Sequence, residues 1–348
     1  MSRRAPKQGN RAFADNVLEH ATPRPLKTAP TKKRAPRLKP RTQPPTAASI
    51  ATAANLTASN DILALFHRTF AVAFSRPDLH QLLQTVKGHL YNRDYAAAFG
   101  TPEYLSAYVI RWSPSRALCY RNVFLCLCDE VTDVFQTADN EGTSEIVCIG
   151  GGAGAELVGA AAATRNLLPR GEAALGKVHV TAIDMAEWSE PFSALTADIC
   201  ENYIPIAQPG VFSADFYRED ILAPSVPLEN LIPVSTKLIM LLFTTNELYT
   251  QSRTATTKLL LSLAAIVEKG CLLLVLESAG SYSTVQVGEK TFSMGMLLEH
   301  TLLGPDGDWE KIEGDDARWF RLPGEGKGLR YPLALENMRY FVRVFRRL

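Results

Sequence analysis

The residues with the clearest capacity for chemistry form a glycine-rich turn that follows a short apolar run at residues 146–149. Its four glycines are Gly150, Gly151, Gly152 and Gly154. Glycines placed in this way permit a tight turn from a strand into a helix, close approach of a ligand to the backbone, and N–H groups aimed at that ligand. The same pattern is also compatible with a tight turn that binds nothing.

An acidic residue, Asp184, ends the next apolar run at residues 178–183. A carboxylate at this place can accept hydrogen bonds from both ribose hydroxyls of an adenosine-containing cofactor, so the turn and the acid together predict a nucleoside cofactor. The glycine spacing is GxGxG rather than the dinucleotide-binding GxGxxG, and no Lys-Ser or Lys-Thr pair follows to form a P-loop. These differences favour S-adenosylmethionine (SAM) over NAD or ATP.

Polar residues also follow two later apolar segments. Asp220 and Ile221 come after a predicted third strand, where Rossmann-like methyltransferases usually contact the adenine, although Asp220 could instead cap a helix. Thr245, Asn246 and Glu247 follow the fourth strand, whose carboxyl end should face the methyl group to be transferred. Thr245 and Asn246 could also be helix caps, and Glu247 could be a first-turn carboxylate favoured by the helix dipole.

The elements that must position these residues are apolar runs separated by helix-compatible segments. Four runs lie at residues 146–149, 178–183, 238–243 and 271–276. Continuous apolar runs of this length are typical of strands buried on both faces, so they predict a parallel sheet covered by helices. Residues 338–346 alternate basic and apolar side chains and predict a closing strand with one solvated face.

The segment ahead of the sheet, residues 59–140, predicts an all-helical region. Helix starts are expected at Ser59, Pro77, Pro102 and Pro114, each followed by apolar residues at helical spacing. Proline suits the first turn of a helix, where its missing N–H is no loss. A further helix is expected near residues 294–303.

Residues 1–58 predict a disordered basic arm and linker. The first 50 residues hold 12 basic side chains, two acidic ones and eight of the 21 prolines, without apolar periodicity. The 348-residue chain has a formal net charge of +1, so this +10 segment precedes a body of −9. The asymmetry indicates a polyanionic partner or a nuclear address; a merely solubilising tail is an equally good interpretation.

Composition also argues against several classes of protein. The basic N-terminus lacks the apolar core of a signal peptide, and the most apolar later stretch, residues 259–276, is interrupted by Glu268, Lys269 and Gly270. We therefore expect neither a secretion signal nor a membrane span. The six cysteines include no CxxC pair and no histidine at metal-ligand spacing, which favours buried thiols in a reducing compartment and no metal site. Nothing in the sequence predicts the oligomeric state.

Several motifs, taken in order, resemble those of the fungal large-subunit rRNA uridine-N3 methyltransferases, which are SAM-dependent. They lie at residues 108–118, 148–157, 243–248, 280–283, 317–323 and 335–340. The resemblance covers the chain from about residue 60 onward, and the order of the motifs is more specific than any one of them. One departure from the general methyltransferase pattern is Cys148, where an acidic residue often precedes the first glycine.

This resemblance implies an α/β fold of the Rossmann-like class I methyltransferases at residues 141–348: a mostly parallel seven-stranded sheet with helices on both faces. It also implies that the chain methylates N3 of one uridine in 25S rRNA during ribosome biogenesis. The expected setting is nuclear or nucleolar, with room for a cytoplasmic pool. The substrate would be naked rRNA or a pre-ribosomal particle.

Aromatic and cationic side chains cluster twice outside the cofactor motifs. The clusters are Arg111, Trp112 and Arg116 in one place and Arg318, Trp319, Phe320 and Arg321 in the other. Unstacked bases are commonly held against aromatic faces while arginines hold phosphates, so these residues are predicted to contact RNA; tryptophans anchored in the core are the alternative. Ser281 and Tyr282 follow the fifth strand and are expected to border the acceptor pocket, unless they form a plain loop.

The chemistry of uridine adds one requirement. N3 carries a proton and is a poor nucleophile while neutral, so methyl transfer requires that this proton be removed or strongly hydrogen-bonded. Glu247 is the best candidate to receive it, with Asn246 orienting a uracil carbonyl; Glu336, or positioning of the base alone, is the alternative. The base must be single-stranded or flipped out of its stack.

Two rival functions stay open on sequence grounds. One is a methyltransferase that acts on a protein or a small molecule, which the acidic body favours, since RNA enzymes more often have basic surfaces. The other is an inactive scaffold in ribosome assembly that binds the cofactor and is tethered by its basic arm.

Overall fold

The computed structural model describes residues 47–136, 142–168, 176–205, 210–279, 284–287, 290–304 and 307–348. All of the described residues belong to one compact unit, Pro45–Leu348. The predicted disorder of residues 1–46 therefore lies outside the described residues. The predicted boundary between residues 140 and 141 also falls outside them.

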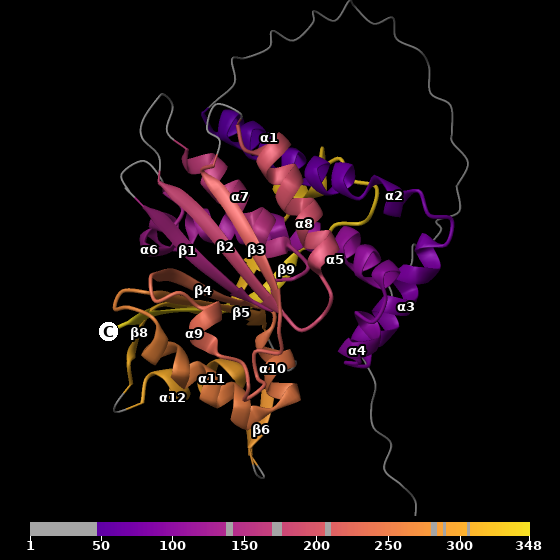
Figure 1. Cartoon of the computed structure of the whole chain (residues 1–348). Coiled ribbons are helices and arrows are strands. Elements are labelled where there is room, and N and C mark those ends of the chain that lie inside the picture. Colours follow the sequence, from indigo (N-terminus) through magenta and orange to yellow (C-terminus); the bar gives the residue numbers. More distant parts are fainter. Residues whose placement is uncertain are drawn as a thin grey trace, which may run out of the picture. The chain divides into compact units, whose positions relative to one another are not determined.

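A group of helices precedes the sheet, as predicted (Figure 1). The described helices are α1 (Ala47–Thr69), α2 (Ala71–Phe74), α3 (Leu79–Tyr91), α4 (Tyr95–Ala98), α5 (Pro102–Cys126) and α6 (Asp129–Asp133). The prediction that residues 47–58 form a linker and that Ser59 caps a helix is wrong, because α1 already begins at Ala47. This stretch is rich in alanine, the strongest helix former, and contains neither glycine nor proline. The hydroxyl of Ser59 instead donates to the carbonyl of Asn55 within the helix, at 2.7 Å.

A second difference concerns Pro114, which lies inside α5 instead of starting a helix. A proline cannot donate to the carbonyl four residues earlier, so Ile110 would lose its helical partner. The hydroxyl of Tyr331 donates to that carbonyl at 2.6 Å and supplies the missing bond. The neighbouring Ser113 hydroxyl donates to the carbonyl of Ala153 at 2.9 Å, so this part of α5 is tied to the glycine-rich turn. These bonds to distant segments explain why the helix continues.

Seven strands of the described chain form one sheet in the order β3-β2-β1-β4-β5-β9-β8 (Figure 1). Their bounds are β1 (Thr143–Ile149), β2 (Lys177–Asp184), β3 (Phe212–Arg218), β4 (Thr236–Leu242), β5 (Leu272–Ser278), β8 (Trp309–Phe320) and β9 (Met338–Arg347). Strands β1 to β5 pair in parallel, and β9 is antiparallel to both of its neighbours. The predicted mostly parallel seven-stranded sheet is confirmed. The strand order reverses between β1 and β4, and ligands of open α/β sheets bind beyond the carboxyl ends of the strands at such a point.

Alternation along the strands divides the core into two layers. In β1, Ile146 and Cys148 belong to the layer shared with α1, α5, α7 and α8, whereas Val147 and Ile149 belong to the layer shared with α10, α11 and α12. The remaining helices are α7 (Ala155–Leu167), α8 (Ser189–Asp198), η1 (Ile199–Tyr203), α9 (Leu228–Leu231), α10 (Thr245–Gln251), α11 (Arg253–Ile266), α12 (Met294–Leu302) and η2 (Pro323–Gly326). Helices therefore cover both faces of the central strands, as predicted, and α12 confirms the helix expected near residues 294–303.

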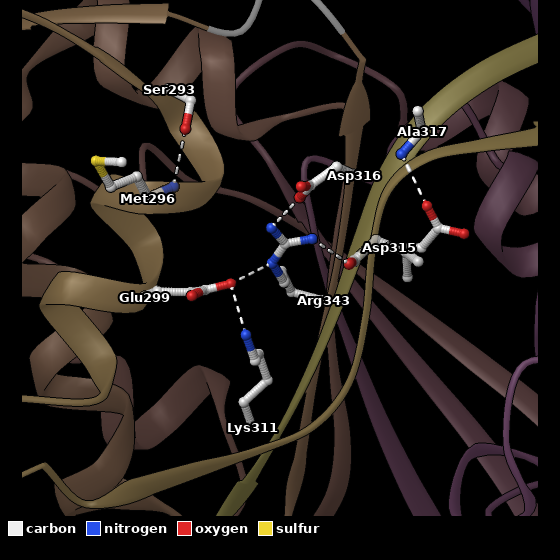
Figure 2. Close-up of polar contacts among 9 residues, drawn as sticks. Ser293, Met296, Glu299, Lys311, Asp315, Asp316, Ala317 and Arg343 are labelled. Carbon is white, nitrogen blue, oxygen red and sulfur yellow. Dashed lines mark hydrogen bonds and ion pairs between the residues drawn. The ribbon is translucent and has the colours of Figure 1, made fainter.

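A hairpin of β6 (Thr284–Val287) and β7 (Lys290–Ser293) leads into α12. An ion-pair cluster then fixes α12 to the edge of the sheet (Figure 2). Arg343 of β9 donates from Nε to Glu299 of α12 at 2.6 Å and pairs with Asp316 of β8 through Nη2. Lys311 of β8 adds a contact of 3.0 Å to the same Glu299 carboxylate. The position of α12 thus depends on a buried guanidinium.

None of the described helices is long and apolar enough to span a membrane. The cysteines are free thiols, and Cys119, Cys148 and Cys271 are buried as expected. The expectation of burial is wrong for Cys126 and Cys200, which are exposed. Within the described residues, no cluster of three or more His, Cys, Asp or Glu side chains could hold a metal ion.

Candidate functional site

A cavity of about 610 Å³ opens at the carboxyl ends of β1, β2 and β4. Four residues selected from the sequence line it: Gly150, Asp184, Glu247 and Arg116. The first three follow β1, β2 and β4, whereas Arg116 comes from α5 of the helical region. The parallel sheet thus brings together residues that lie as much as a hundred positions apart, at the place where its strand order reverses.

The glycine-rich turn needs each of its four glycines for space: a Cβ on Gly151 would lie 2.7 Å from the side chain of Cys148, and one on Gly154, whose φ is +75°, would lie 2.3 Å from that of Leu195. Gly150 has a φ of +81°, and a Cβ there would lie 2.4 Å from the side chain of Thr244. A Cβ on Gly152 would lie 2.1 Å from the ring of Trp188. Larger residues at these two positions would therefore displace Thr244 and Trp188, which both line the cavity. Gly151 and Gly154 belong to the same turn, with Gly154 preceding α7.

Asp184 at the end of β2 is held by the backbone. Its Oδ2 accepts from the N–H of Gly152 at 3.2 Å, and its Oδ1 accepts from the N–H of Ala186 at 3.0 Å. Burial raises the pKa of this carboxyl, while the N–H groups of Ala186 and Gly152 oppose the shift. A carboxylate has about four acceptor sites, so these two bonds leave room for a ribose diol.

Arg116 forms the inner wall of the cavity. Its Nη1 donates to the hydroxyl of Tyr108 at 2.6 Å, and its guanidinium carbon lies 5.4 Å from the centre of the Phe243 ring. Burial lowers the pKa of Arg116, but Tyr108, Tyr120 and Glu156 raise it by more, so the side chain stays charged. Because the other donors of the guanidinium have no hydrogen-bond partner among the described residues, Arg116 can bind a carboxylate or a carbonyl in the cavity.

Two carboxyl groups of the cavity titrate near neutral pH. Burial raises the pKa of Glu247 to about 8, with further raising by Asp184 and Glu277 against the opposing effect of Arg116. Burial likewise raises the pKa of Glu156 to about 7. A general base works best with a pKa near the working pH, so either group has the strength to accept a proton from a substrate.

Glu277 is a residue that the sequence analysis did not select. It is the penultimate residue of β5, is only 2% exposed, and accepts from the Thr245 hydroxyl at 3.2 Å and from the Asn246 N–H at 3.1 Å. Its other oxygen accepts from the N–H of Ser278 at 2.8 Å. Thr245 and Asn246 are therefore tied to β5, and neither of them lines the cavity. An acid directly after the apolar run at residues 271–276, just as Asp184 directly follows the run at residues 178–183, is the signal that could have found Glu277.

The segment that carries Glu247 is also strained at its start. Phe243 has a φ of +61°, a conformation that is an outlier for a bulky residue. Its N–H donates to the carbonyl of Leu276 at 2.7 Å, which holds it beside β5. Such strain clusters at functional sites, and here it directs the chain from β4 into α10, whose first turn contains Glu247.

Asp220 and Ile221 lie beside the cavity instead of lining it. The Asp220 carboxylate accepts from the N–H of Leu222 at 3.1 Å and from the side chain of Gln251 at 2.8 Å, and Gln251 lines the cavity. Ile221 is buried in the core layer shared with α10 to α12. No helix begins at Asp220 in the described chain, so the alternative of a helix cap is wrong and a turn takes its place.

The first predicted RNA cluster is divided by the fold. Arg116 lines the cavity, whereas Arg111 pairs with Glu336 and donates to the carbonyl of Ala334 at 3.0 Å. The ring of Trp112 lies 5.1 Å from that of Tyr108, and the Arg111 guanidinium lies 5.5 Å from the Trp112 ring. Arg111 and its ion-pair partner Glu336, the alternative proton acceptor, therefore hold a C-terminal segment against α5.

The second predicted cluster lies apart from the cavity. Trp319 is 49% exposed and has the Arg321 guanidinium 4.1 Å from its ring centre, while Arg318 pairs with Asp315 at 3.7 Å. Trp319 and Arg321 line a separate depression of about 220 Å³ that shares no residue with the cavity. The structure thus does not bring the two clusters together. Ser281 and Tyr282 lie outside the described residues.

The helical region supplies a wall of the cavity that the sequence analysis missed. Arg93, Tyr95 and Phe99, in and around the short helix α4, all line it, as does Tyr108 of α5. An arginine near an aromatic residue is a weak signal in a sequence. These residues are recognised as cavity residues only once α4 is seen to pack beside the sheet.

Comparisons with known proteins agree with this geometry. A family described as SAM-dependent methyltransferases matches residues 66–346. The 25S rRNA (uridine(2843)-N(3))-methyltransferase of Saccharomyces cerevisiae is 34% identical over 312 residues, which covers 82% of this chain and 84% of the yeast protein.

Solved structures resemble the chain more weakly. The N-methyltransferase NodS of Bradyrhizobium japonicum, solved with S-adenosyl-L-homocysteine, is 12% identical with a TM-score of 0.36 and matches 76% of this chain and 98% of its own. An O-methyltransferase family protein of Burkholderia thailandensis is 12% identical with a TM-score of 0.40 and matches 82% of this chain and 72% of its own. The family match and the yeast relative span most of the chain, and the chain therefore belongs to the family of SAM-dependent methyltransferases.

Proposed function

We propose that the chain transfers a methyl group from SAM to N3 of a uridine in large-subunit rRNA. The observation that carries the proposal is Glu247, a half-buried carboxyl with its pKa raised to about 8 that lines the same cavity as Gly150 and Asp184. N3 of a uridine must lose its proton to become nucleophilic, and Glu247 has the strength to take it. The name of the yeast relative, a 25S rRNA uridine-N3 methyltransferase, supports the choice of substrate.

The residues of the cavity fit SAM in three ways. Asp184 can accept from the ribose hydroxyls, and the absent side chains of Gly150 and Gly152 let the cofactor approach the backbone. Gln251, held by Asp220, can meet the adenine. Arg116, predicted from the sequence as an RNA contact, is better suited to the carboxylate of the methionine part, because it lines the cavity together with Ala155 and Glu156 at the start of α7.

The bound cofactor supplies the methyl group as an electrophilic sulfonium. The protein then has to hold uracil N3 in line with it, exclude water and accept the N3 proton at a Glu247 oxygen. Glu277 fixes the backbone of Asn246, the residue before Glu247, so that this oxygen is held at the cavity. Asn246 itself does not line the cavity, which weakens its predicted role in orienting a uracil carbonyl.

The same proposal places the chain with large-subunit rRNA or a pre-ribosomal particle as its partner, in the nucleus or nucleolus. The +10 charge of residues 1–50 supports both, since basic segments bind polyanions and serve as nuclear addresses.

Nucleoside mass spectrometry of large-subunit rRNA tests the proposal in cells that carry the wild-type chain, Gly152→Arg, Glu247→Gln or no chain. The arginine would collide with Trp188 and block the cofactor turn, whereas glutamine keeps the shape of the cavity and removes only the base. We expect one 3-methyluridine to be lost in all three altered strains. An unchanged profile would exclude the uridine activity and direct attention to a protein substrate or a scaffold role.

A binding assay then separates an enzyme from an inactive scaffold. Purified Glu247→Gln protein should bind SAM as wild type does, while Gly152→Arg should not. If wild-type protein binds SAM but methylates neither rRNA nor pre-ribosomal particles, the scaffold becomes the better account.

A further inference from the structure

Three arginines line the cavity, and their surroundings differ. Arg116 is half-buried and donates to the hydroxyl of Tyr108, and Arg218 pairs with Glu187 at 2.8 Å. Arg93 is exposed and has no side-chain hydrogen bond or ion pair among the described residues. Most of the other charged groups that line the cavity are carboxylates. Arg93 is therefore the lining cation that is available to bind an anionic substrate.

The backbone at Arg93 is unusual for an arginine. Its φ is +57°, in the left-handed region. The N–H of Arg93 donates to the carbonyl of Leu90 at 3.1 Å, and the N–H of Asp94 donates to that of His89 at 2.9 Å. This is the Schellman motif that ends α3, and its left-handed position is usually a glycine. An arginine here carries a backbone strain that glycine would avoid, which indicates that its side chain has a use.

Tyr95, two residues later, presents an aromatic ring to the same cavity. It is half-buried, and its ring stacks on no other ring of the described chain. Burial raises the pKa of Tyr95 to about 12, with additional raising from the Glu247 and Glu277 carboxylates. Tyr95, Glu247 and Arg93 line the same cavity, and Glu247 has the largest effect of any charged group on this pKa, which Arg93 opposes.

We propose that Arg93 and Tyr95 hold the target nucleotide, with the uracil stacked on the Tyr95 ring and a neighbouring phosphate paired with Arg93. This inference rests on the proposed rRNA methylation. RNA bases that leave their stack are commonly held on aromatic faces, and arginine pairs with phosphate through two parallel hydrogen bonds. Two residues at the junction of α3 and α4 would thus hold the base and the backbone of a single nucleotide.

The strained backbone offers a variant that separates binding from folding. Arg93→Gly removes the cation and also relieves the left-handed strain, so the melting temperature should stay the same or rise. Tyr95→Phe keeps the ring, and Tyr95→Ala removes it. Lys87→Ala is the matched control, because Lys87 is an exposed cation of α3 that does not line the cavity.

The assay uses the full chain as enzyme. Its substrate is large-subunit rRNA purified from cells that do not express the chain. For Arg93→Gly we expect the KM for rRNA to rise about tenfold and the slope of log affinity against log salt to fall by about one, with the KM for SAM unchanged. Tyr95→Ala should lose about tenfold or more in kcat/KM for rRNA, while Tyr95→Phe and Lys87→Ala stay within about twofold of wild type.

Three results would overturn these expectations in different ways. An unchanged KM for rRNA and salt slope in Arg93→Gly would exclude the phosphate contact. A rise in the KM for SAM in Tyr95→Ala, without a change for rRNA, would assign the ring to the cofactor. A wild-type chain that forms no 3-methyluridine would overturn the proposed function itself and this inference with it, whereas an active wild type with unaffected variants would overturn only the inference.

Discussion

Glu247 combines a position at the carboxyl end of β4 with an environment that changes its acidity. A first-turn carboxylate at a helix N-terminus is ordinarily stabilised in its charged form. Here burial and the neighbouring Asp184 and Glu277 outweigh that effect and raise its pKa to about 8. The helix-dipole interpretation of Glu247 therefore does not account for its surroundings, which suit a group that accepts a proton.

The pH dependence of the rate follows from this pKa. A general base must be ionised, so activity should rise as the pH increases toward 8 and level off above it. At pH 6 about one hundredth of the molecules would carry an ionised Glu247, with a rate reduced to match. Initial rates of rRNA methylation at saturating SAM and RNA, measured from pH 6 to 9, test this.

Glu247→Gln should lose about 10² to 10⁴ in kcat together with the rise of rate up to pH 8, while its affinity for SAM stays near that of wild type. A variant that keeps both the rate and the pH profile would show that positioning of the base alone drives the reaction.

Among the contacts between secondary-structure elements, Glu277 holds the junction between β4 and α10. One buried carboxylate accepts from the Thr245 hydroxyl and the Asn246 N–H, and thereby holds the start of α10 to the end of β5. In Glu277→Gln, an amide NH₂ replaces one oxygen and must face an N–H donor.

We therefore expect Glu277→Gln to lower the free energy of unfolding by about 1–3 kcal/mol, the usual cost of an unsatisfied buried group. It should also lower kcat, because Glu247 follows Asn246 directly. Denaturant unfolding combined with steady-state kinetics tests both effects. Full stability with a normal rate would mean that other contacts fix the junction.

The attachment of α12 to the sheet is a second contact between elements, and it is centred on Arg343 (Figure 2). The guanidinium side chain is only 10% exposed, while its partner Asp316 is 88% exposed. Arg343→Ala should lower the free energy of unfolding by about 2 kcal/mol, because hydrogen bonds to a charged group are lost and the space is left unfilled. Asp316→Asn is the control and should change stability little, since exposed pairs contribute little. Thermal or urea unfolding distinguishes the two variants.

Acid should reduce the difference in stability between wild type and Arg343→Ala. Although burial opposes the shift, Lys311 and Arg343 lower the pKa of Glu299 below its usual range. A carboxyl whose pKa is lowered on folding stabilises the protein above its unfolded pKa of about 4.3, and this contribution is lost as the pH falls through the lower folded value. The difference in unfolding free energy between wild type and Arg343→Ala should therefore be large at pH 7 and small at pH 3. Equal differences at both values would contradict a role for the Glu299 charge.

Elements that are specified by local sequence were predictable, and those that depend on distant partners were not. The apolar runs of β1, β2, β4 and β5 and the turn at Gly150 carry their signal within a few residues. Pro114 was misread because the hydroxyl that compensates it, on Tyr331, is more than two hundred residues away. Tyr95 acquires its meaning only when α4 packs beside the cavity, which no linear pattern expresses, whereas Glu277 directly follows an apolar run and could have been selected in the same way as Asp184.

Charge distribution acts at the scale of the whole molecule. All 12 basic side chains counted in the first 50 residues lie before residue 45, and the remainder of the chain is acidic. An acidic body repels RNA, so an enzyme of this charge gains affinity from a basic segment. Since residues 45–348 form a compact unit apart from Met1–Pro44, the two contributions can be separated by truncation.

Deletion of residues 1–44 should weaken rRNA binding at low salt by at least about tenfold and reduce the slope of log affinity against log salt, because each lost phosphate contact removes about 0.7 to 0.9 from that slope. The melting temperature, the affinity for SAM and kcat at saturating RNA should not change, since the cavity lies within residues 45–348. A full-length control with Lys32, Lys33 and Arg34 replaced by glutamine separates charge from length: partial loss of the slope implicates charge. An unchanged slope in both proteins would mean that the segment is a nuclear address or a solubilising tail, and the affinity for RNA would then have to come from the body, with Arg93 and Arg321 as the first cations to test.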